Sequence, residues 1–454
     1  KMASSFFLSL SFLFLLSIFS FVDVSEAASS TKLLLPVVKD NTKTQYFTSF
    51  LVGAPKPTRV YLAIDLSNLW SWFTCDIYGY NTSSTFKNVD CDSPKCGTYG
   101  GIGCVSCMSG PPIPSCTNNS CGADAYSPWS NGLYSGGLVD DTISLYSLQA
   151  QNPAQISKAS LRDFPFTCAD KGPLKGLSPY TKGILTLARR PVALHAQISS
   201  AFKVPHKFAL CLPASSASTS GYNGAMYFGG GPYHLPPTSR VDLSRSLVTT
   251  PLVVNPNSTA PIYTEGDPSV EYFINVRSIK VDGTPARFRS SLLSFDKDGV
   301  GGTKISTMDP YTVLHTEIYK ALIDVFISKA TAMKITRVAS VAPYGACFDA
   351  KTIANTNTGP GVPIIDIILD GKSPVLHNKN ARWRIYGANS MVKVSNKVLC
   401  LGFVDGGSSP RTSIVIGGKQ MEDNLVEIDL EANKLGVTSS LLHFGTTCSH
   451  FKGI

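Results

Sequence analysis

Two short polar segments, which begin at Asp65 and Ser306, have the residue types and the spacing that could do chemistry. The first, residues 65–68 (DLSN), follows the apolar run 60–64, and the second, residues 306–309 (STMD), lies 241 positions further along the chain. Two carboxylates a few ångström apart that share one proton can activate water and protonate a carbonyl. A serine cannot act as a carboxylic acid near neutral pH. If the two segments meet in the fold, their first residues bring together one carboxylate, Asp65, and one hydroxyl, Ser306.

The surroundings of the two segments also repeat, which suggests a duplicated architecture. Each segment is followed at a distance by an apolar stretch that runs into small residues, 183–186 (GILT) and 415–418 (VIGG). Prolines and polar residues interrupt the strand pattern between His234 and Thr250. We therefore expect two lobes, residues 28–240 and 241–454, with their boundary in this interval.

The elements that must position these segments are mostly β-strands. Only 16% of the residues are charged, and 37 glycines and 29 prolines are scattered along the chain, as in proteins with many short strands and turns. Residues 272–281 alternate as a strand does, and Asp282-Gly283 closes them as a turn. The clearest helix spans 317–333, with Thr316 as its expected N-cap. Its apolar face consists of Ile318, Leu322, Phe326 and Ala330.

The beginning of the chain has the pattern of a secretory leader. An apolar run broken only by serines, residues 6–22, precedes a small-residue cleavage site at 25–28 (SEAA). A membrane anchor is the alternative, because the run is near the lower limit for a spanning helix. No basic stop-transfer flank follows the run. We therefore expect residues 1–27 to be removed, and the mature protein to be extracellular, in the apoplast or cell wall, without a membrane anchor.

Cysteines and glycosylation sites agree with this compartment. Twelve cysteines allow up to six disulfides, which the oxidising secretory route permits. Acceptor sequons begin at Asn81, Asn118 and Asn257. Zinc is the alternative for the cysteines, but no second CxxC or HxxxH element lies at finger spacing. We therefore expect disulfides and no metal.

The remaining motifs and the charge exclude several classes of function. The sequence has no GxSxG elbow, no P-loop and no GxGxxG after a strand, so we expect no cofactor. The formal net charge is +9, and loss of Lys1, Asp23 and Glu26 with the leader makes it +10. Lysine and arginine are dispersed rather than clustered, which argues against a nucleic-acid partner. An acidic extracellular partner, or simple solubility, is the better explanation.

Several motifs in the right order resemble the pepsin superfamily of aspartic proteases over nearly the whole mature length. The match is closest to the plant subfamily of extracellular dermal glycoproteins, xyloglucan-endoglucanase inhibitors, nectarin-type proteins and basic seven-S globulins. This resemblance implies an all-β fold with two β-barrel lobes, related by a pseudo-two-fold axis, and a cleft between them. Tyr126, followed by Gly137-Leu138 and Asp141-Thr142, resembles the flap hairpin over that cleft. The segments that carry the resemblance are 60–72, 208–213, 227–231, 301–314 and 414–435.

The resemblance also defines what the chain lacks. An active site of this superfamily has one aspartate in each of two Asp-Thr/Ser-Gly turns. Here Asp65 is followed by Leu66 and Ser67, and Ser306 occupies the second aspartate position. Asp309 is three residues away from that position, and Thr186 replaces a glycine that packs beside the first turn. The resemblance therefore implies a degenerate dyad, Asp65 and Ser306, and no protease activity.

A rigid scaffold with long surface loops suits protein binding. The subfamily includes blockers of microbial cell-wall glycoside hydrolases, whose clefts carry two carboxylates. We therefore expect an inhibitor of a xyloglucan-specific endo-β-glucanase or a related endoglucanase or xylanase. An inserted arginine can bind such a carboxylate with two parallel hydrogen bonds. The candidates are Arg411, in the turn-rich loop 406–412, and Arg337. An extracellular ligand binder or storage-like globulin, and an active aspartic endopeptidase, are the alternatives.

The same resemblance leads us to expect that all twelve cysteines are paired. Cys347 should pair with Cys400 inside the second lobe, and Cys211 with Cys448 should tie the chain end to the close of the first lobe. Most of the other eight should staple the loops between Cys75 and Cys168, where strand pattern is sparse.

Overall fold

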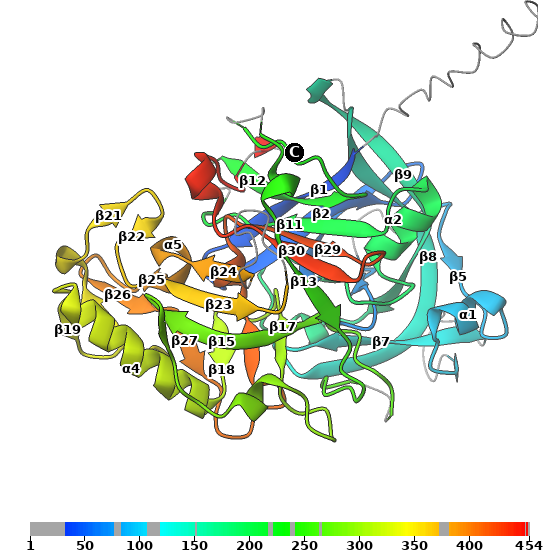
Figure 1. Cartoon of the computed structure of the whole chain (residues 1–454). Helices are drawn as coiled ribbons and strands as arrows, with labels where there is room; N and C mark the ends of the chain where they lie inside the picture. The colour runs from blue at the N-terminus through cyan, green and yellow to red at the C-terminus, as the bar shows by residue number, and fades with distance from the viewer. Residues whose placement is uncertain are drawn as a thin grey trace, which may run out of the picture.

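The computed structural model describes residues 32–76, 83–106, 119–149, 152–216, 221–236, 241–262, 266–371, 381–449 and 451–452. The predicted leader, Asn81, Asn118 and two of the cysteines, Cys107 and Cys116, lie outside these residues. The described chain is mostly β-strand and forms two lobes on either side of a shared sheet (Figure 1). No helix in the described ranges is both long enough and apolar enough to cross a bilayer.

Six strands form the sheet that joins the two lobes, in the order β1–β12–β11–β29–β30–β13, with every neighbouring pair antiparallel. The first three strands come from the first half of the chain and the last three from the second half, so the pseudo-two-fold axis passes between β11 and β29. Their bounds are β1 Lys32–Asp40, β11 Lys207–Cys211, β12 Tyr222–Phe228, β13 Val248–Val253, β29 Leu425–Asp429 and β30 Lys434–Val437. The proposed lobe boundary at 240/241 falls between the ends of β12 and β13.

Each lobe also contains the same four-strand unit, which confirms the duplication expected from the sequence. In the first lobe β3 is parallel to β10, β10 antiparallel to β4, and β4 parallel to β9. In the second lobe β17, β28, β18 and β27 repeat these three pairings in the same order. The bounds are β3 Thr58–Asp65, β4 Trp72–Thr74, β9 Asn152–Ala169, β10 Gly183–Thr186, β17 Thr303–Ile305, β18 Thr312–Leu314, β27 Phe403–Asp405 and β28 Ile414–Ile416.

The other elements cover these units. The remaining strands of the first lobe are β2 Gln45–Val52, β5 Lys87–Asn88, β6 Cys104–Val105, β7 Ser120–Ser127 and β8 Gly132–Gln149. Those of the second half are β14 Phe273–Ile274, β15 Val276–Val281, β16 Thr284–Pro285, β19 Arg337–Val338, β20 Cys347–Asp349, β21 Asn355–Thr356, β22 Gly359–Pro360, β23 Ile365–Leu369, β24 Arg382–Ile385, β25 Met391–Lys393, β26 Val398–Leu401 and β31 Phe451–Lys452. The α-helices are α1 Pro94–Tyr99, α2 Leu194–Phe202, α4 Thr316–Ala332, α5 Gly387–Ser390 and α6 Gly418–Met421. The 3₁₀-helices are η2 Gly172–Leu174, η3 Leu243–Ser246, η4 Ser290–Leu293, η5 Ala350–Thr352 and η6 Leu441–Phe444.

The predicted strand at 272–281 and its turn are present. The stretch forms β14 and β15, and Val281 pairs with Thr284 across the turn. Both turn residues have positive φ, 43° at Asp282 and 78° at Gly283. This is the backbone that a two-residue hairpin with right-twisted strands requires, and glycine and aspartate adopt it most readily.

The predicted helix is also present, but its expected N-cap was wrong. Ile318, Leu322, Phe326 and Ala330 are buried on one face of α4, as predicted. The N-cap is His315, whose Nδ1 accepts a hydrogen bond from the Glu317 N–H at 3.1 Å. Thr316 is the first helical residue, and its hydroxyl donates to Asp405 Oδ1 at 2.6 Å. The threonine side chain is taken by a distant acceptor, so the preceding histidine caps the helix.

Five disulfides lie within the described residues. Both bridges that the sequence singled out, Cys347–Cys400 and Cys211–Cys448, are among them. The other three staple the loops of the first lobe: Cys75–Cys168, Cys91–Cys104 and Cys96–Cys121. A group made of Cys91, Asp92 and Cys104 has the size of a metal site, but its two sulfur atoms are already joined to each other.

One buried carboxylate connects the two lobes near the shared sheet. Glu422 is 1% exposed, and its Oε1 accepts hydrogen bonds from Lys39 Nζ at 2.5 Å and from the Tyr46 hydroxyl at 2.7 Å. Its Oε2 accepts from Lys419 Nζ at 2.7 Å. Lys39 and Tyr46 belong to β1 and β2, whereas Glu422 follows α6, so the contact spans both lobes. We call these four residues the Glu422 clamp.

Candidate functional site

The two polar segments meet at a cavity of about 150 Å³ between the lobes. Asp65 is the last residue of β3, and Ser306 directly follows β17, the equivalent strand of the second lobe. Both line the cavity, together with Tyr126, Glu271 and ten further residues of the same wall: Ser67, Asn68, Leu69, Asp124, Pro128, Ala260, Pro261, Ile262, Met308 and Asp309. Lys304 completes the lining. The sequence repeat therefore brings Asp65 and Ser306 to one site.

Asp65 is held within its own turn. Its side chain is 1% exposed, and Oδ1 accepts hydrogen bonds from the Ser67 N–H at 2.8 Å and the Ser67 hydroxyl at 2.6 Å. Burial raises the pKa of Asp65, and the nearby Glu271 acts in the same direction, while the bonds from Ser67 oppose them. Ser67, at the position of the family's glycine, thus supports the carboxylate rather than distorting the turn.

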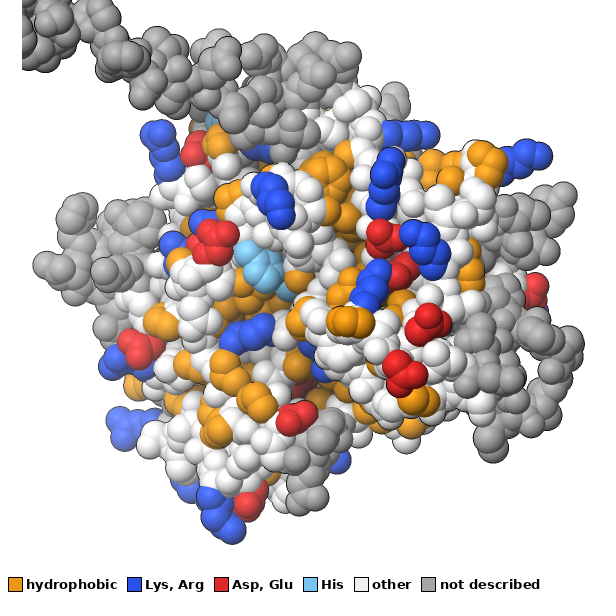
Figure 2. Space-filling model, turned by 90° about the vertical axis from the view of Figure 1, so that its right-hand side faces the viewer, with side chains coloured by type: hydrophobic (Ala, Val, Ile, Leu, Met, Phe, Trp, Pro, Cys, Tyr) orange, Lys and Arg blue, Asp and Glu red, His pale blue; other side chains and the backbone are white. Residues whose placement is uncertain are grey.

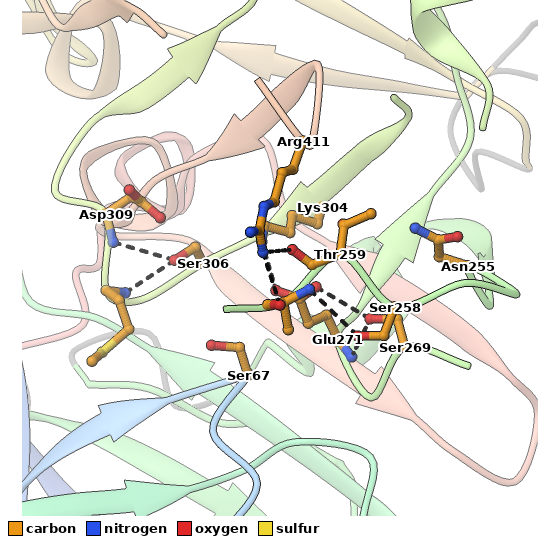
Figure 3. Close-up of polar contacts among 12 residues, drawn as sticks. Ser67, Asn255, Ser258, Thr259, Ser269, Glu271, Lys304, Ser306, Asp309 and Arg411 are labelled. Carbon is orange, nitrogen blue, oxygen red and sulfur yellow. Dashed lines mark hydrogen bonds and ion pairs between the residues drawn. The ribbon is translucent and has the colours of Figure 1, made fainter. Parts of the chain in front are cut away.

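The Ser306 hydroxyl accepts hydrogen bonds from within its own turn. Its Oγ accepts hydrogen bonds from the backbone N–H groups of Met308 and Asp309, each at 3.2 Å. The Asp309 carboxylate is directed away from Ser306 (Figure 3). The Asp309 carbonyl accepts from the Gly418 N–H at 2.8 Å, which fixes this part of the turn. A shift of three residues that placed Asp309 opposite Asp65 would break this bond.

The braces between the two turns are asymmetric. In the second turn the Thr307 hydroxyl donates to the Ile64 carbonyl of the first turn at 2.6 Å. The equivalent residue of the first turn is Leu66, which has no hydroxyl and is packed in the main core. Beside it, the Thr186 hydroxyl donates to the Asn68 carbonyl, and the Thr186 N–H donates to Ser71 Oγ at 3.1 Å. The side chains that brace the first turn therefore come from its own lobe. Among the described residues, the hydroxyl-to-carbonyl bond between the turns runs only from Thr307 of the second turn to Ile64 of the first.

A buried ion pair in the cavity was not predicted from the sequence. Glu271 is 2% exposed, and its Oε1 lies 2.5 Å from Lys304 Nζ, while its Oε2 accepts from the Ser269 hydroxyl at 3.1 Å (Figure 3). Lys304 is the middle residue of β17, two positions before Ser306. A positively charged group thus lies in the same wall as Ser306, which occupies the position of the second aspartate. A single charged residue inside an apolar strand was the signal available in the sequence.

Tyr126, the residue expected on the flap, lines this cavity and is attached to the first turn. Tyr126 is on β7, opposite Leu133 of β8. Its carbonyl accepts hydrogen bonds from Asn68 Nδ2 at 2.7 Å and from the Trp72 indole N–H at 2.9 Å. Partial burial raises the pKa of Tyr126, with a smaller contribution from Asp65 in the same direction, while Arg411 lowers it. The flap is therefore held down, and Arg411 lies close enough to influence it.

The two candidate arginines lie in different places. Arg411 is exposed at the rim of the cavity, where its Nη1 donates to the carbonyls of Thr259 and Ala260, both at 2.9 Å (Figure 3). Its Nε and Nη2 form no hydrogen bond with the described part of the chain, so one edge of the guanidinium is available. Arg337 is exposed at the start of β19, at the outer end of the second lobe (Figure 1).

Of the three predicted glycosylation sites, only Asn257 lies within the described residues. Its Nδ2 donates a hydrogen bond to the Lys297 carbonyl at 2.8 Å.

A buried histidine, His195, lies behind the first turn and contacts Tyr272 of the second lobe. His195 is 2% exposed; its Nε2 lies 2.9 Å from the Ala188 carbonyl, and its Nδ1 lies 2.8 Å from His206 Nε2. Tyr272, from the second lobe, donates to the Leu187 carbonyl at 2.7 Å, and the Leu187 N–H donates to the Asp65 carbonyl at 2.7 Å. A neutral ring that donates from Nε2 and accepts at Nδ1 satisfies both of its neighbours.

Protonation of His195 should therefore destabilise the fold. Burial lowers the pKa of His195 from 6.5 to about 3, so the unfolded chain takes up a proton that the folded chain excludes. Stability from this group is complete above pH 6.5 and is lost as the pH falls toward 3, with a slope of about 1.4 kcal/mol per pH unit. Asp423 acts in the opposite sense, because burial raises its pKa to about 6 and acid favours its folded form.

The test compares pH profiles rather than stabilities at one pH. Between pH 6.5 and 4, the free energy of unfolding of the unmodified protein, measured by urea denaturation, should fall by about 3 kcal/mol more than that of His195→Gln. His443→Gln, at an exposed histidine, is the matched control and should keep the original slope. Parallel profiles for His195→Gln and the unmodified protein would contradict this account. Asp423 is unchanged in all three proteins and cancels.

Family models and known relatives show which family the chain belongs to. A family model described as "Xylanase inhibitor N-terminal" matches residues 46–230, and one described as "Xylanase inhibitor C-terminal" matches residues 271–439. The chain belongs to this xylanase-inhibitor family. It is 45% identical over 437 residues to "Probable aspartic proteinase GIP2" of Nicotiana benthamiana, covering 95% of each chain.

Solved structures agree with this family and with the pepsin-like fold. The structure titled "Crystal structure of edgp" superimposes with a TM-score of 0.85 at 41% identity, covering 93% of this chain and 98% of that one. Conglutin gamma, "a unique basic 7S globulin from lupine seeds", gives a TM-score of 0.75 at 30% identity, covering 93% and 99%. In this xylanase-inhibitor-family chain, Asp65 lies in the N-terminal match and Ser306 and Arg411 in the C-terminal match. The cavity is therefore formed between the two family domains.

Proposed function

We propose that this protein is a secreted, catalytically inactive aspartic-protease homologue that inhibits microbial cell-wall glycoside hydrolases. The target class is a xyloglucan-specific endo-β-glucanase or a related endoglucanase or xylanase. The match of both lobes to xylanase-inhibitor models carries the proposal. The serine at position 306 supports the absence of catalysis, since pepsin-type hydrolysis needs two carboxylates that share a proton.

The loop that we propose as inhibitory, residues 406–412, is rigid. The Gly406 and Gly407 N–H groups donate to Leu314 O at 2.8 Å and Asp405 Oδ1 at 2.9 Å. His315 Nε2 lies 2.8 Å from the Ser408 carbonyl, and the Arg411 carbonyl accepts from the Gly301 N–H at 2.9 Å. A loop that is ordered before binding loses little entropy when it binds. Arg411, held by Nη1 with its other edge available, could pair with a carboxylate of an acidic cleft.

The experiment that tests this proposal is an inhibition assay without any assumption about the target. The purified protein is titrated against a panel of fungal and bacterial xyloglucanases, endoglucanases and xylanases, with release of reducing sugar as the readout. Stoichiometric inhibition of at least one enzyme supports the proposal. A protein that neither inhibits nor binds any member of the panel would favour the second candidate.

That second candidate is an extracellular ligand-binding or storage-like globulin. It is favoured by the similarity to conglutin gamma, a basic 7S globulin, over nearly the whole chain. An active endopeptidase is the third, because a 45% identical relative is named a probable aspartic proteinase. Ser306 and the Lys304–Glu271 pair argue against this third candidate.

We expect no acid protease activity. The unmodified protein should not degrade casein at acid pH in a pepstatin-sensitive manner. Ser306→Asp alone should not restore cleavage, because Leu66 still lacks the hydroxyl that would reach the second turn and Lys304 remains in the wall. Pepsin under the same conditions is the positive control. Pepstatin-sensitive digestion by the unmodified protein would overturn the expectation and revive the endopeptidase.

A further inference from the structure

A second concave site lies on the first lobe. It is a groove of about 700 Å³ lined by residues of β1, β2, β3, β12 and the turn at 179–180, and it shares no lining residue with the cavity around Asp65 and Ser306. Its volume is within the range of small-ligand sites in proteins. The degenerate dyad plays no part in this groove, so its function is separate from the family's cleft.

Aromatic rings form an exposed platform in the groove. Tyr180 is 66% exposed, the highest value among the large hydrophobic side chains of the described residues, and Tyr61 is 37% exposed. Both rings contact Phe47, which is 5% exposed: Tyr180 stacks on it with centroids 6.3 Å apart and planes 26° apart, and Tyr61 meets it edge-on at 6.2 Å. The buried ring fixes two exposed ones, which leaves flat apolar surface facing solvent.

Polar atoms of the groove lack hydrogen-bond donors. Asp40 and Asn223 both line it and are each 7% exposed. Asp40 Oδ1 accepts from the N–H and the hydroxyl of Thr42, at 2.8 and 2.7 Å, and the Ser178 hydroxyl lies near the Asp40 carboxylate. Within the described residues, no hydrogen bond reaches Asp40 Oδ2 or Asn223 Oδ1. Burying an acceptor without a donor is unfavourable, so these atoms require one. Lys39 does not provide it, because its ammonium group is already paired with Glu422 and the Ala214 carbonyl.

We propose that this groove binds a neutral oligosaccharide. The apolar C–H face of a pyranose ring would stack on Tyr180 and Tyr61, and ring hydroxyls would donate to Asp40 and Asn223. A polyol suits a site whose two unpaired buried atoms are both acceptors, because every hydroxyl can donate. An extended peptide also presents carbonyls, which would need donors here. The Asp40 carboxylate disfavours uronate-rich or sulfated chains. This proposal does not depend on the inhibition of a hydrolase.

The test is calorimetric titration of the full-length secreted protein with no hydrolase present. The neutral probes are cellohexaose, xylohexaose and a released high-mannose N-glycan, which separate a wall polysaccharide from a glycoprotein glycan as the source. Oligogalacturonate and a proline-rich decapeptide are the comparison probes. We expect at least one neutral probe to bind, Tyr180→Ala to weaken that binding about tenfold, and Tyr180→Trp to retain it.

The large exposure of Tyr180 makes misfolding of these variants a minor concern, and melting temperatures check it. Leu133→Ala is the matched control, since Leu133 is 52% exposed on the flap hairpin, outside the groove. The proposal is overturned if no neutral probe binds at millimolar concentration, or if Tyr180→Ala binds as well as the unmodified protein. Preferential binding of oligogalacturonate or of the peptide would overturn it as well.

Discussion

Glu422→Gln should lower the free energy of unfolding by about 3–5 kcal/mol, the cost of leaving buried charges without a partner. The carboxylate is 1% exposed and faces two ammonium groups, whose side chains are 10% exposed in Lys39 and 16% in Lys419. The amide keeps the shape of the side chain but neutralises its charge, so the Glu422 clamp loses both ion pairs at once. Guanidinium denaturation at pH 7 measures the change.

Two variants make this result specific. Asp370→Asn removes an ion pair of similar length, 2.8 Å to Arg277, whose side chains are 45% and 59% exposed. Because exposed pairs contribute about 0–1 kcal/mol, this control should cost little. Combining Glu422→Gln with Lys39→Met should cost less than the sum of the two single changes, since the unpaired lysine is gone. A loss for Glu422→Gln no larger than that for Asp370→Asn would show that the clamp does not hold the lobes together.

A substitution of Arg411 should have the second large effect, a loss of inhibition. This prediction rests on the proposed function. Arg411→Ala should weaken inhibition of a susceptible endoglucanase by about 2–4 kcal/mol, roughly 160-fold at the middle of that range. The reason is that a guanidinium buried against a carboxylate at the centre of an interface leaves that carboxylate unpaired when it is removed. Arg411→Lys should recover only part of the loss, because the charge returns without the planar fork. Inhibition constants at two salt concentrations are the measurement.

The structure adds a control for this experiment. Arg411 Nη1 also donates to Thr259 and Ala260, so the alanine variant could loosen the loop as well as remove the charge. An unchanged melting temperature separates the two effects. Arg245→Ala, at an arginine that is 86% exposed on η3, should leave the inhibition constant unchanged. A loss below threefold for Arg411→Ala would place Arg411 at the edge of the interface, and Arg337 would then be the next candidate.

The pairing of Asp65 with Ser306 was accessible from the sequence because a repeat suggested a duplicated architecture and the family resemblance assigned the two residues to equivalent positions. The same apolar run, polar turn and later apolar stretch occur twice, and in the fold that the resemblance implies, equivalent residues meet across a pseudo-two-fold axis. The register of β3 with β10 and of β17 with β28 is the structural form of that repeat. Patterns that recur along a chain predict contacts between the copies without any knowledge of side-chain geometry.

The contacts that escaped sequence analysis join residues with no shared pattern. Lys304 and Glu271 are 33 positions apart, and their pairing depends on β17 lying beside β14. Thr316 was the better N-cap by residue type, but Asp405, 89 positions away, takes its hydroxyl. Tyr180 and Phe47 come from a turn and a strand that nothing in the sequence connects. Local propensity cannot rank such long-range partners, because the competing donor or acceptor becomes visible only in the fold.

The bridge between Cys211 and Cys448 has a consequence for the resistance of the protein to proteolysis. It joins residues 237 positions apart, so the chain between them forms a covalent ring that contains residues 241–448 of the second lobe. One cut by a protease at an exposed loop of that ring would open it without releasing either piece. The two pieces would also stay joined by the backbone hydrogen bonds of the six-stranded sheet to which both lobes contribute. A nicked molecule should therefore keep its mass on a non-reducing gel, and only a second cut or a reductant would let it come apart.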